Sequence, residues 1–116
     1  MGKILVVDDE EMMRDCVSTI LTSMGFDILK AKDGQEAYEI YLEQRTDISL
    51  IIMDIMMPRM DGIAASKAIK TLDPTVKVIL MSGHSNYSLS EARADSFINK
   101  PFTFANLKEE IRKVLA

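Results

Sequence analysis

Short runs of apolar residues that end in a polar residue recur along this chain. Residues 50–53 are all apolar and lead directly into Asp54, and Pro58 and Gly62 interrupt the chain soon afterwards. A continuous apolar run is typical of a strand that is buried on both faces, as in a parallel sheet. We therefore predict a central strand with Asp54 at its carboxyl end.

The remaining pattern predicts further strands that alternate with helices. The other predicted strands cover residues 4–7, 26–31, 76–81 and 96–99. Apolar residues at helical spacing lie between and after them, at Met12, Cys16, Val17, Ile20, Leu21 and Met24, at Ala37, Ile40 and Tyr41, at Ala65, Ala68, Ile69 and Leu72, and at Leu107, Ile111, Val114 and Leu115. Such alternation with short connections predicts an α/β fold with a parallel sheet covered by helices on both faces.

Composition limits the size and the environment of this fold. With 116 residues, 47% hydrophobic, the chain suits one domain over residues 1–116 with one core. The net charge is −4, and no basic run favours binding to nucleic acid or an anionic membrane. We see no secretory signal and no apolar stretch near the roughly 18 residues of a membrane span, so we expect a cytoplasmic location. Cys16 is the only cysteine, which excludes an intramolecular disulfide, and we interpret it as a core residue.

Polar residues at four predicted strand ends should meet at one edge of the sheet, because parallel strands end on the same side. They are Asp8 and Asp9, Asp54, Ser82 and Lys100. Two carboxylates about 4 Å apart repel by about 4 kcal/mol at an effective dielectric constant near 20, and a hard cation such as Mg²⁺ relieves this. With Mg²⁺ and Lys100 neutralising a phosphoryl group, Asp54 can act as the nucleophile while the Ser82 hydroxyl donates a hydrogen bond.

Several motifs in this order resemble the receiver domains of response regulators in two-component signalling. The matching segments lie at residues 4–10, 31–37, 54–62, 81–83 and 100–102, so the resemblance covers essentially the whole chain. It implies a flavodoxin-like, doubly wound five-stranded sheet with strand order 2-1-3-4-5. It also implies a cis peptide bond between Lys100 and Pro101.

The resemblance assigns roles to the residues at the strand ends. It implies that Asp54 is the phosphoacceptor and that Ser82 and Lys100 contact the phosphoryl group. Mg²⁺ is expected on Asp8, Asp9, Asp54 and the main-chain carbonyl of Met56. Phe97 and Ser82 are expected to act as the switch residues. The implied partners are a sensor histidine kinase or phosphotransfer protein as donor and a protein target downstream.

Two features depart from what the resemblance leads us to expect. Lys100 lies only 18 positions after Ser82, which leaves residues 86–92 for a fourth helix that must be short or irregular. We expect this region to become more ordered on phosphorylation. Met56 and His84 stand two residues beyond Asp54 and Ser82 and would flank the phosphoryl group. Because Met56 cannot hydrogen-bond an attacking water, we expect a long-lived phosphorylated state.

Other functions remain open at this point. An aspartyl-phosphate phosphatase would use similar chemistry, but such enzymes usually need a second acid where this chain has Met56. A degenerate receiver that only binds partners is disfavoured, since the expected metal and phosphoryl positions are intact. A flavin-binding flavodoxin is disfavoured by the acidic loop after the first strand. The chain is also compatible with a receiver domain taken from a larger regulator or hybrid kinase.

Overall fold

A five-stranded parallel sheet forms the centre of the computed structural model, which describes residues 2–83 and 89–116. Its strands are β1 (Lys3–Val7), β2 (Ile28–Ala31), β3 (Ile48–Asp54), β4 (Lys77–Ser82) and β5 (Ser96–Asn99). They lie in the order β2-β1-β3-β4-β5, and every pairing is parallel. The predicted flavodoxin-like order is therefore confirmed.

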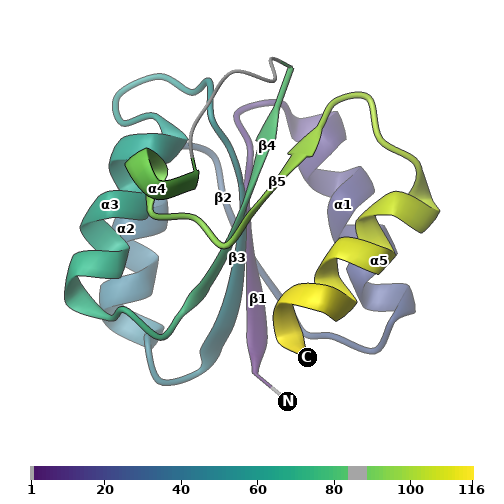
Figure 1. Cartoon of the computed structure of the whole chain (residues 1–116), viewed down its shortest axis with the longest axis horizontal. Coiled ribbons are helices and arrows are strands. Elements are labelled where there is room, and N and C mark those ends of the chain that lie inside the picture. Colours follow the sequence, from purple (N-terminus) through teal and green to yellow (C-terminus); the bar gives the residue numbers. More distant parts are fainter. Residues whose placement is uncertain (1, 84–88) are drawn as a thin grey trace.

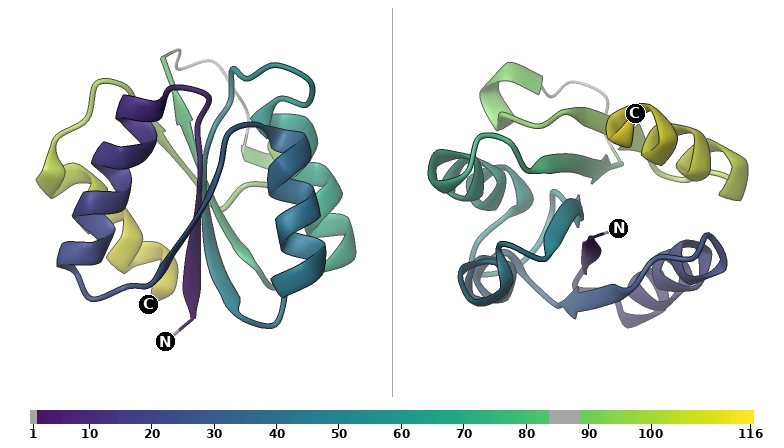
Figure 2. Two further views of the ribbon diagram at one scale, coloured as in Figure 1. Left: turned by 180° about the vertical axis from the view of Figure 1, so that it is seen from behind. Right: turned by 90° about the horizontal axis from the view of Figure 1, so that it is seen from below.

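Helices cover both faces of this sheet (Figures 1 and 2). On one face lie α1 (Glu11–Ser23) and α5 (Phe104–Leu115), and on the other lie α2 (Gly34–Gln44), α3 (Gly62–Leu72) and α4 (Leu89–Ala92). Two hydrophobic cores result, one between each helical layer and the sheet. This is the layered arrangement that alternating strands and helices predict.

The central strand β3 contributes to both cores. Ile51 and Met53 belong to the core under α2 and α3, whereas Leu50 and Ile52 belong to the core under α1 and α5. Successive side chains of a strand point to opposite faces, so a strand covered on both sides must be apolar at every position. This explains the unbroken apolar run before Asp54.

Side-chain caps fix where three of the helices begin. Asp33 accepts a hydrogen bond from the main-chain N–H of Glu36 at 2.8 Å, and Asp61 accepts one from Ala64 at 2.8 Å. Thr103 forms a capping box at the start of α5. Each such cap stabilises a helix end by about 1 kcal/mol. The cap at Asp61 starts α3 directly after the loop that follows Asp54.

Three residues predicted to face the core do not. Met12 is 86% exposed, Leu115 is 36% exposed, and Cys16 is exposed. In α1 the buried stripe runs through Val17, Ile20 and Leu21, and Met13 packs against it in place of Met12. Met12 and Cys16 are one turn apart on the neighbouring face, and Leu115 likewise lies one residue beyond the buried face of α5.

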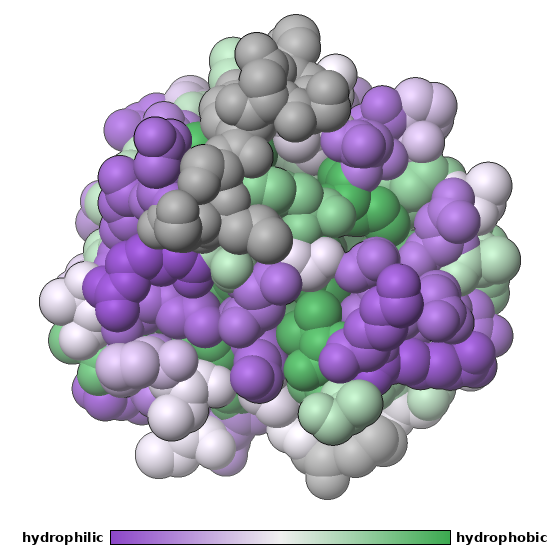
Figure 3. Space-filling view, in the orientation of Figure 1, coloured by the Kyte–Doolittle hydropathy of each residue, from purple (hydrophilic) through white to green (hydrophobic). Residues whose placement is uncertain are grey.

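The fourth helix is short, as predicted. α4 contains only the four residues Leu89–Ala92. The first part of the predicted helix, residues 86–88, and His84 lie outside the described residues. On the face that carries α4, β5 and α5, hydrophobic residues occur in small areas between hydrophilic ones (Figure 3). Within the described ranges, the helices are too short or too polar to cross a bilayer.

Candidate functional site

Two neighbouring strands bring the acidic residues together. Val7 of β1 pairs with Met53 of β3, so Asp8 and Asp54 follow at adjacent strand ends. Asp8 is fully buried and Asp54 is 7% exposed, whereas Asp9 is exposed. Carboxylate oxygens of these three residues all lie within 4.8 Å of one another. The structure therefore assembles the acidic cluster that the sequence predicts.

Lys100 approaches this cluster from the end of β5. Its Nζ lies 3.2 Å from Oδ2 of Asp54 and 3.3 Å from Oδ2 of Asp8. The main-chain N–H of Lys100 donates to the carbonyl of Ser82 at 2.7 Å, which joins the ends of β4 and β5. The peptide bond between Lys100 and Pro101 is cis, as the resemblance implied. One ammonium group is thus shared by two carboxylates.

Burial and charge act against each other in this cluster. Burial raises the pKa of the Asp54 carboxyl, and the nearby Lys100 ammonium and the main-chain N–H of Met56 oppose the rise. Burial also raises the pKa of Asp8, opposed by the N–H of Glu10 at 2.9 Å and by Lys100. For Lys100, burial lowers the pKa, but the attraction of Asp8 and Asp54 outweighs it and the pKa is raised. Lys100 is therefore held in its charged form.

The acidic cluster fits a Mg²⁺ ion by the chemistry of its donors. Asp8 and Asp54 share the Lys100 ammonium and Asp9 adds a third carboxylate, so negative charge remains to be balanced. Mg²⁺ prefers a few carboxylate oxygens and retains several waters. Because Asp9 is exposed, the cluster is open on one side to solvent. Asp8, Asp9 and Asp54 can thus hold such an ion without enclosing it.

The remaining predicted site residues lie around this centre. Ser82 is 3% exposed and follows Met81, the residue that pairs with Asp54 across β3 and β4. Phe97 lies in β5 opposite Leu80 and packs, partly buried, against the core under α3. Met56 is 65% exposed in the loop after β3. His84 cannot be placed, since it lies outside the described residues.

Close backbone contacts hold the loop after Asp54 in place. Gly62 donates its N–H to the carbonyl of Ile55 at 2.9 Å, and a Cβ atom on Gly62 would overlap the carbonyl oxygen of Asp54. A Cβ on Gly34 would overlap the carbonyl oxygen of Met60 in the same loop. Only glycine allows these approaches. The loop is therefore packed directly between β3 and the helices α2 and α3.

Two further residues support the site and were missed by the sequence analysis. Arg14 donates from Nη1 to the main-chain carbonyl of Asp8 at 2.8 Å, which ties α1 to the end of β1. Arg59 has a φ of 67° and lies 3.6 Å from Asp33, between Nε and Oδ2. Neither residue stands at a predicted strand end. The left-handed backbone at Arg59 carries no sequence signal, because that conformation favours glycine or asparagine.

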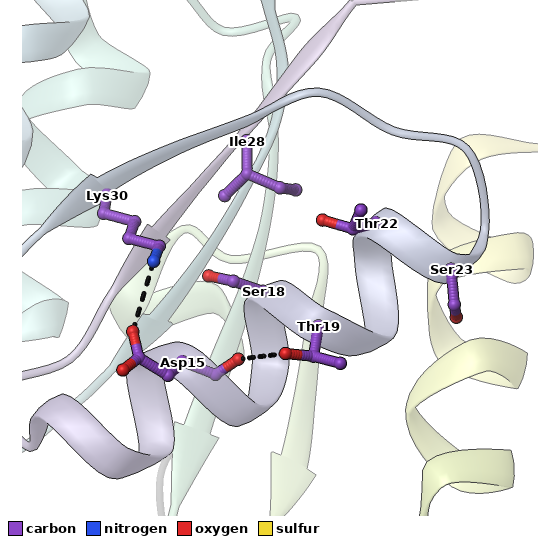
Figure 4. A pocket seen from close by; sticks show the side chains of 7 residues that line it. All are labelled: Asp15, Ser18, Thr19, Thr22, Ser23, Ile28 and Lys30. Carbon is purple, nitrogen blue, oxygen red and sulfur yellow. Dashed lines mark hydrogen bonds and ion pairs between the residues drawn. The ribbon is translucent and has the colours of Figure 1, made fainter.

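A groove elsewhere on the molecule does not coincide with these residues. It encloses about 680 Å³ between α1 and the edge strand β2 (Figure 4). Its hydroxyl groups bond back to their own helix, from Ser18 to the carbonyl of Arg14 at 2.7 Å and from Thr19 to that of Asp15 at 2.9 Å. Lys30 pairs with Asp15 at 3.1 Å across it. The hydroxyls of Ser18 and Thr19 and the charges of Lys30 and Asp15 are therefore already paired within the protein.

Known proteins resemble this chain over nearly all of its length. It is 40% identical over 118 residues to the chemotaxis protein CheY of Bacillus subtilis, and the match covers 97% of each chain. In other curated relatives the matching region is part of a longer chain, of which this one covers 48% in one case and 52% in another.

Solved structures show the same arrangement. A chain from the complex of CheX and CheY with BeF3 and Mg²⁺ from Borrelia burgdorferi has a TM-score of 0.93 and 31% identity, covering 99% of this chain and 90% of that one. The response regulator TrrA from Thermotoga maritima, in complex with Mg²⁺ and BeF, has a TM-score of 0.89 and 34% identity, covering 98% and 99%. A family model for the response regulator receiver domain matches residues 4–112. Fold, cluster and matches together show that this chain belongs to the response regulator receiver domain family.

Proposed function

We propose that this chain is a phosphoacceptor signalling domain of the cytoplasm. It takes a phosphoryl group onto Asp54 from the phosphohistidine of a sensor histidine kinase or phosphotransfer protein, in a reaction that requires Mg²⁺. It then changes conformation and signals to a protein target. The observation that carries this proposal is the Asp54 carboxylate at the end of β3, 3.2 Å from the Lys100 ammonium and clustered with Asp8 and Asp9.

Asp54 is the nucleophile in this proposal. One carboxylate oxygen attacks phosphorus, the P–N bond to the donor histidine breaks, and the imidazole nitrogen keeps the electron pair. Lys100 favours the ionised carboxylate and then neutralises phosphoryl oxygens, while the Ser82 hydroxyl donates to another oxygen. When bound by Asp8, Asp9, Asp54 and the Met56 carbonyl, Mg²⁺ supplies further charge neutralisation.

The bonds that follow α4 bear on the proposed conformational change. Arg93, just after α4, donates to Thr71 Oγ1 at 2.9 Å and to the Lys70 carbonyl at 3.4 Å. Asp95 accepts from the buried Lys70 ammonium at 2.7 Å and from the N–H of Val78 at 2.8 Å. These bonds fasten the carboxyl end of the short helix to α3 and β4.

In this proposal Ser82 and Phe97 connect the phosphoryl site with the region around α4. They lie on the adjacent strands β4 and β5, at positions offset by two residues. In this proposal the Ser82 hydroxyl moves toward the phosphoryl group and Phe97 packs more deeply. Hydrogen exchange measured with and without a beryllofluoride mimic tests this, with stronger protection of residues 84–97 expected in its presence. Residues 84–88 of this range lie outside the described residues. Equal protection in both states would rule out an increase in order on phosphorylation.

Phosphorylation of Asp54 is tested with a small phosphodonor such as acetyl phosphate. With Mg²⁺, the full chain should gain one phosphoryl group, stable in acid and labile in base, which peptide mass spectrometry locates on Asp54. Asp54→Asn is the matched control, because it keeps the size of the side chain and removes the nucleophile. Uptake of one phosphate by Asp54→Asn at the wild-type rate would overturn the assignment. Transfer from a panel of sensor kinases then identifies the donor.

The rival functions make different predictions in the same assay. A phosphatase would release inorganic phosphate in many turnovers, whereas a phosphoacceptor stops after one equivalent until it decays. Met56 provides no acid to protonate a leaving group, which favours the phosphoacceptor. A receiver that only binds partners would take up no phosphate, and the intact acidic cluster with Lys100 speaks against it.

A further inference from the structure

The methionines of this chain differ sharply in their exposure. There are nine in the sequence. Met53 and Met81 are completely buried in the sheet, whereas Met12 is 86% exposed and Met56 is 65% exposed. An exposed thioether is open to oxidants in solution and a buried one is not. Chemical oxidation should therefore select Met12 and Met56 over Met53 and Met81.

Met56 is the exposed methionine that directly follows the acceptor residue. It stands two positions after Asp54, and its main-chain N–H interacts with the Asp54 carboxylate. Its Cα is therefore within about 7 Å of both carboxylate oxygens of Asp54. The side chain is unbranched and has three rotatable bonds, so its sulfur can reach the space beside that carboxylate.

We propose that Met56 is a redox modification site, at which a hydroperoxide forms a sulfoxide that shortens the lifetime of the phosphate on Asp54. With hydrogen peroxide, a sulfur lone pair forms the S–O bond as the O–O bond breaks. The departing hydroxide takes up a proton and leaves as water. Sulfur loses two electrons and the peroxide gains two. Methionine sulfoxide reductases reverse the change.

The effect on lifetime follows from the difference between the two side chains. A thioether is apolar and a weak acceptor, so it offers an attacking water no strong hydrogen bond. A sulfoxide oxygen is a strong acceptor that can hold a water molecule for attack on phosphorus. One added hydrogen bond to the attacking water should speed phosphate loss by roughly fivefold. This step rests on the proposed phosphorylation of Asp54.

The site itself is tested by mapping oxidation in the full chain. After brief treatment with dilute hydrogen peroxide, peptide mass spectrometry should find sulfoxide at Met12 and Met56 well before Met53 and Met81. Oxidation of Met56 no faster than that of Met53 would refute the proposal. This measurement does not depend on phosphorylation, so it judges the reactivity of Met56 separately from the proposed function.

The consequence is tested by following loss of phosphate with and without peroxide treatment. Wild type and Met12→Leu should each lose phosphate roughly fivefold faster after oxidation. Met56→Leu keeps the apolar bulk without the sulfur and should not respond to peroxide, and a sulfoxide reductase should restore the wild-type rate. Equal decay of oxidised and untreated wild type, or an equal response in Met56→Leu, would overturn the proposal. A chain that takes up no phosphate refutes the proposed function and the effect on lifetime together.

Discussion

Replacing Gly62 with alanine should have two opposing effects on stability, one from helix propensity and one from packing. Gly62 is the first residue of α3. In a helix, alanine is usually more favourable than glycine by about 0.5–1 kcal/mol. At this position, however, the added Cβ would overlap the carbonyl oxygen of Asp54 and lie 2.9 Å from Cα of Ile55. Both are backbone atoms, so rotation of a side chain cannot relieve the contact.

We therefore expect Gly62→Ala to destabilise the fold. Overpacking costs about 1–3 kcal/mol, and this case belongs at the upper end because the backbone must shift. After subtracting the gain in propensity, the net loss is about 2 kcal/mol. The atoms that must move carry Asp54, whose Oδ2 lies 3.2 Å from Lys100. Since misplacement of reacting groups by about 1 Å can slow a reaction about a hundredfold, phosphorylation should also slow by tenfold or more.

Urea unfolding and phosphate uptake measure these two effects. With a denaturant slope of about 1.5 kcal/mol/M, the midpoint of Gly62→Ala should fall by more than about 1 M. Gly83→Ala is the matched control, because no atom of the described residues lies within 4 Å of its added Cβ, and its stability should change by less than about 0.5 kcal/mol. A Gly62→Ala protein as stable as wild type, with normal phosphate uptake, would refute this reasoning.

Three further outcomes are expected. Asp9→Ala should abolish measurable Mg²⁺ binding, and an unchanged titration would remove Asp9 from the metal site. Met56→Asn should accelerate phosphate loss several-fold because its amide can hold an attacking water, whereas the same change at the exposed Met12 should not; equal decay rates would exclude control by position 56. Tyr41→Phe should cost about 1 kcal/mol at neutral pH, since the hydroxyl donates to Asp73 at 2.7 Å. Burial and that bond raise the pKa of Tyr41 above 10, so its contribution is complete below pH 10 and is lost at higher pH; denaturation of both proteins between pH 7 and pH 11 should show the difference shrinking.

The sequence alone determined the order of strands and helices and the set of residues at the acidic cluster. The run that ends at Asp54 could be read because a strand buried on both faces must be apolar throughout. Asp8 and Lys100 could be assigned to the same edge because parallel strands all end on one side of their sheet. Both inferences need only the periodicity of apolar residues and the alternation of strands and helices, and both can be read directly from the sequence.

Only the tertiary structure decided which surfaces meet. Whether Met12 or its neighbour Met13 is buried depends on the rotation of α1 about its own axis against the sheet. In the structure Met13 packs against the core and Met12 is exposed. The approach of Gly62 to Asp54 and the bond from Arg14 to Asp8 join segments whose sequences carry no sign of each other. The pairing of Lys70 with Asp95 spans 25 positions. Such contacts depend on how the helices and strands pack together in three dimensions, which the local sequence pattern does not specify.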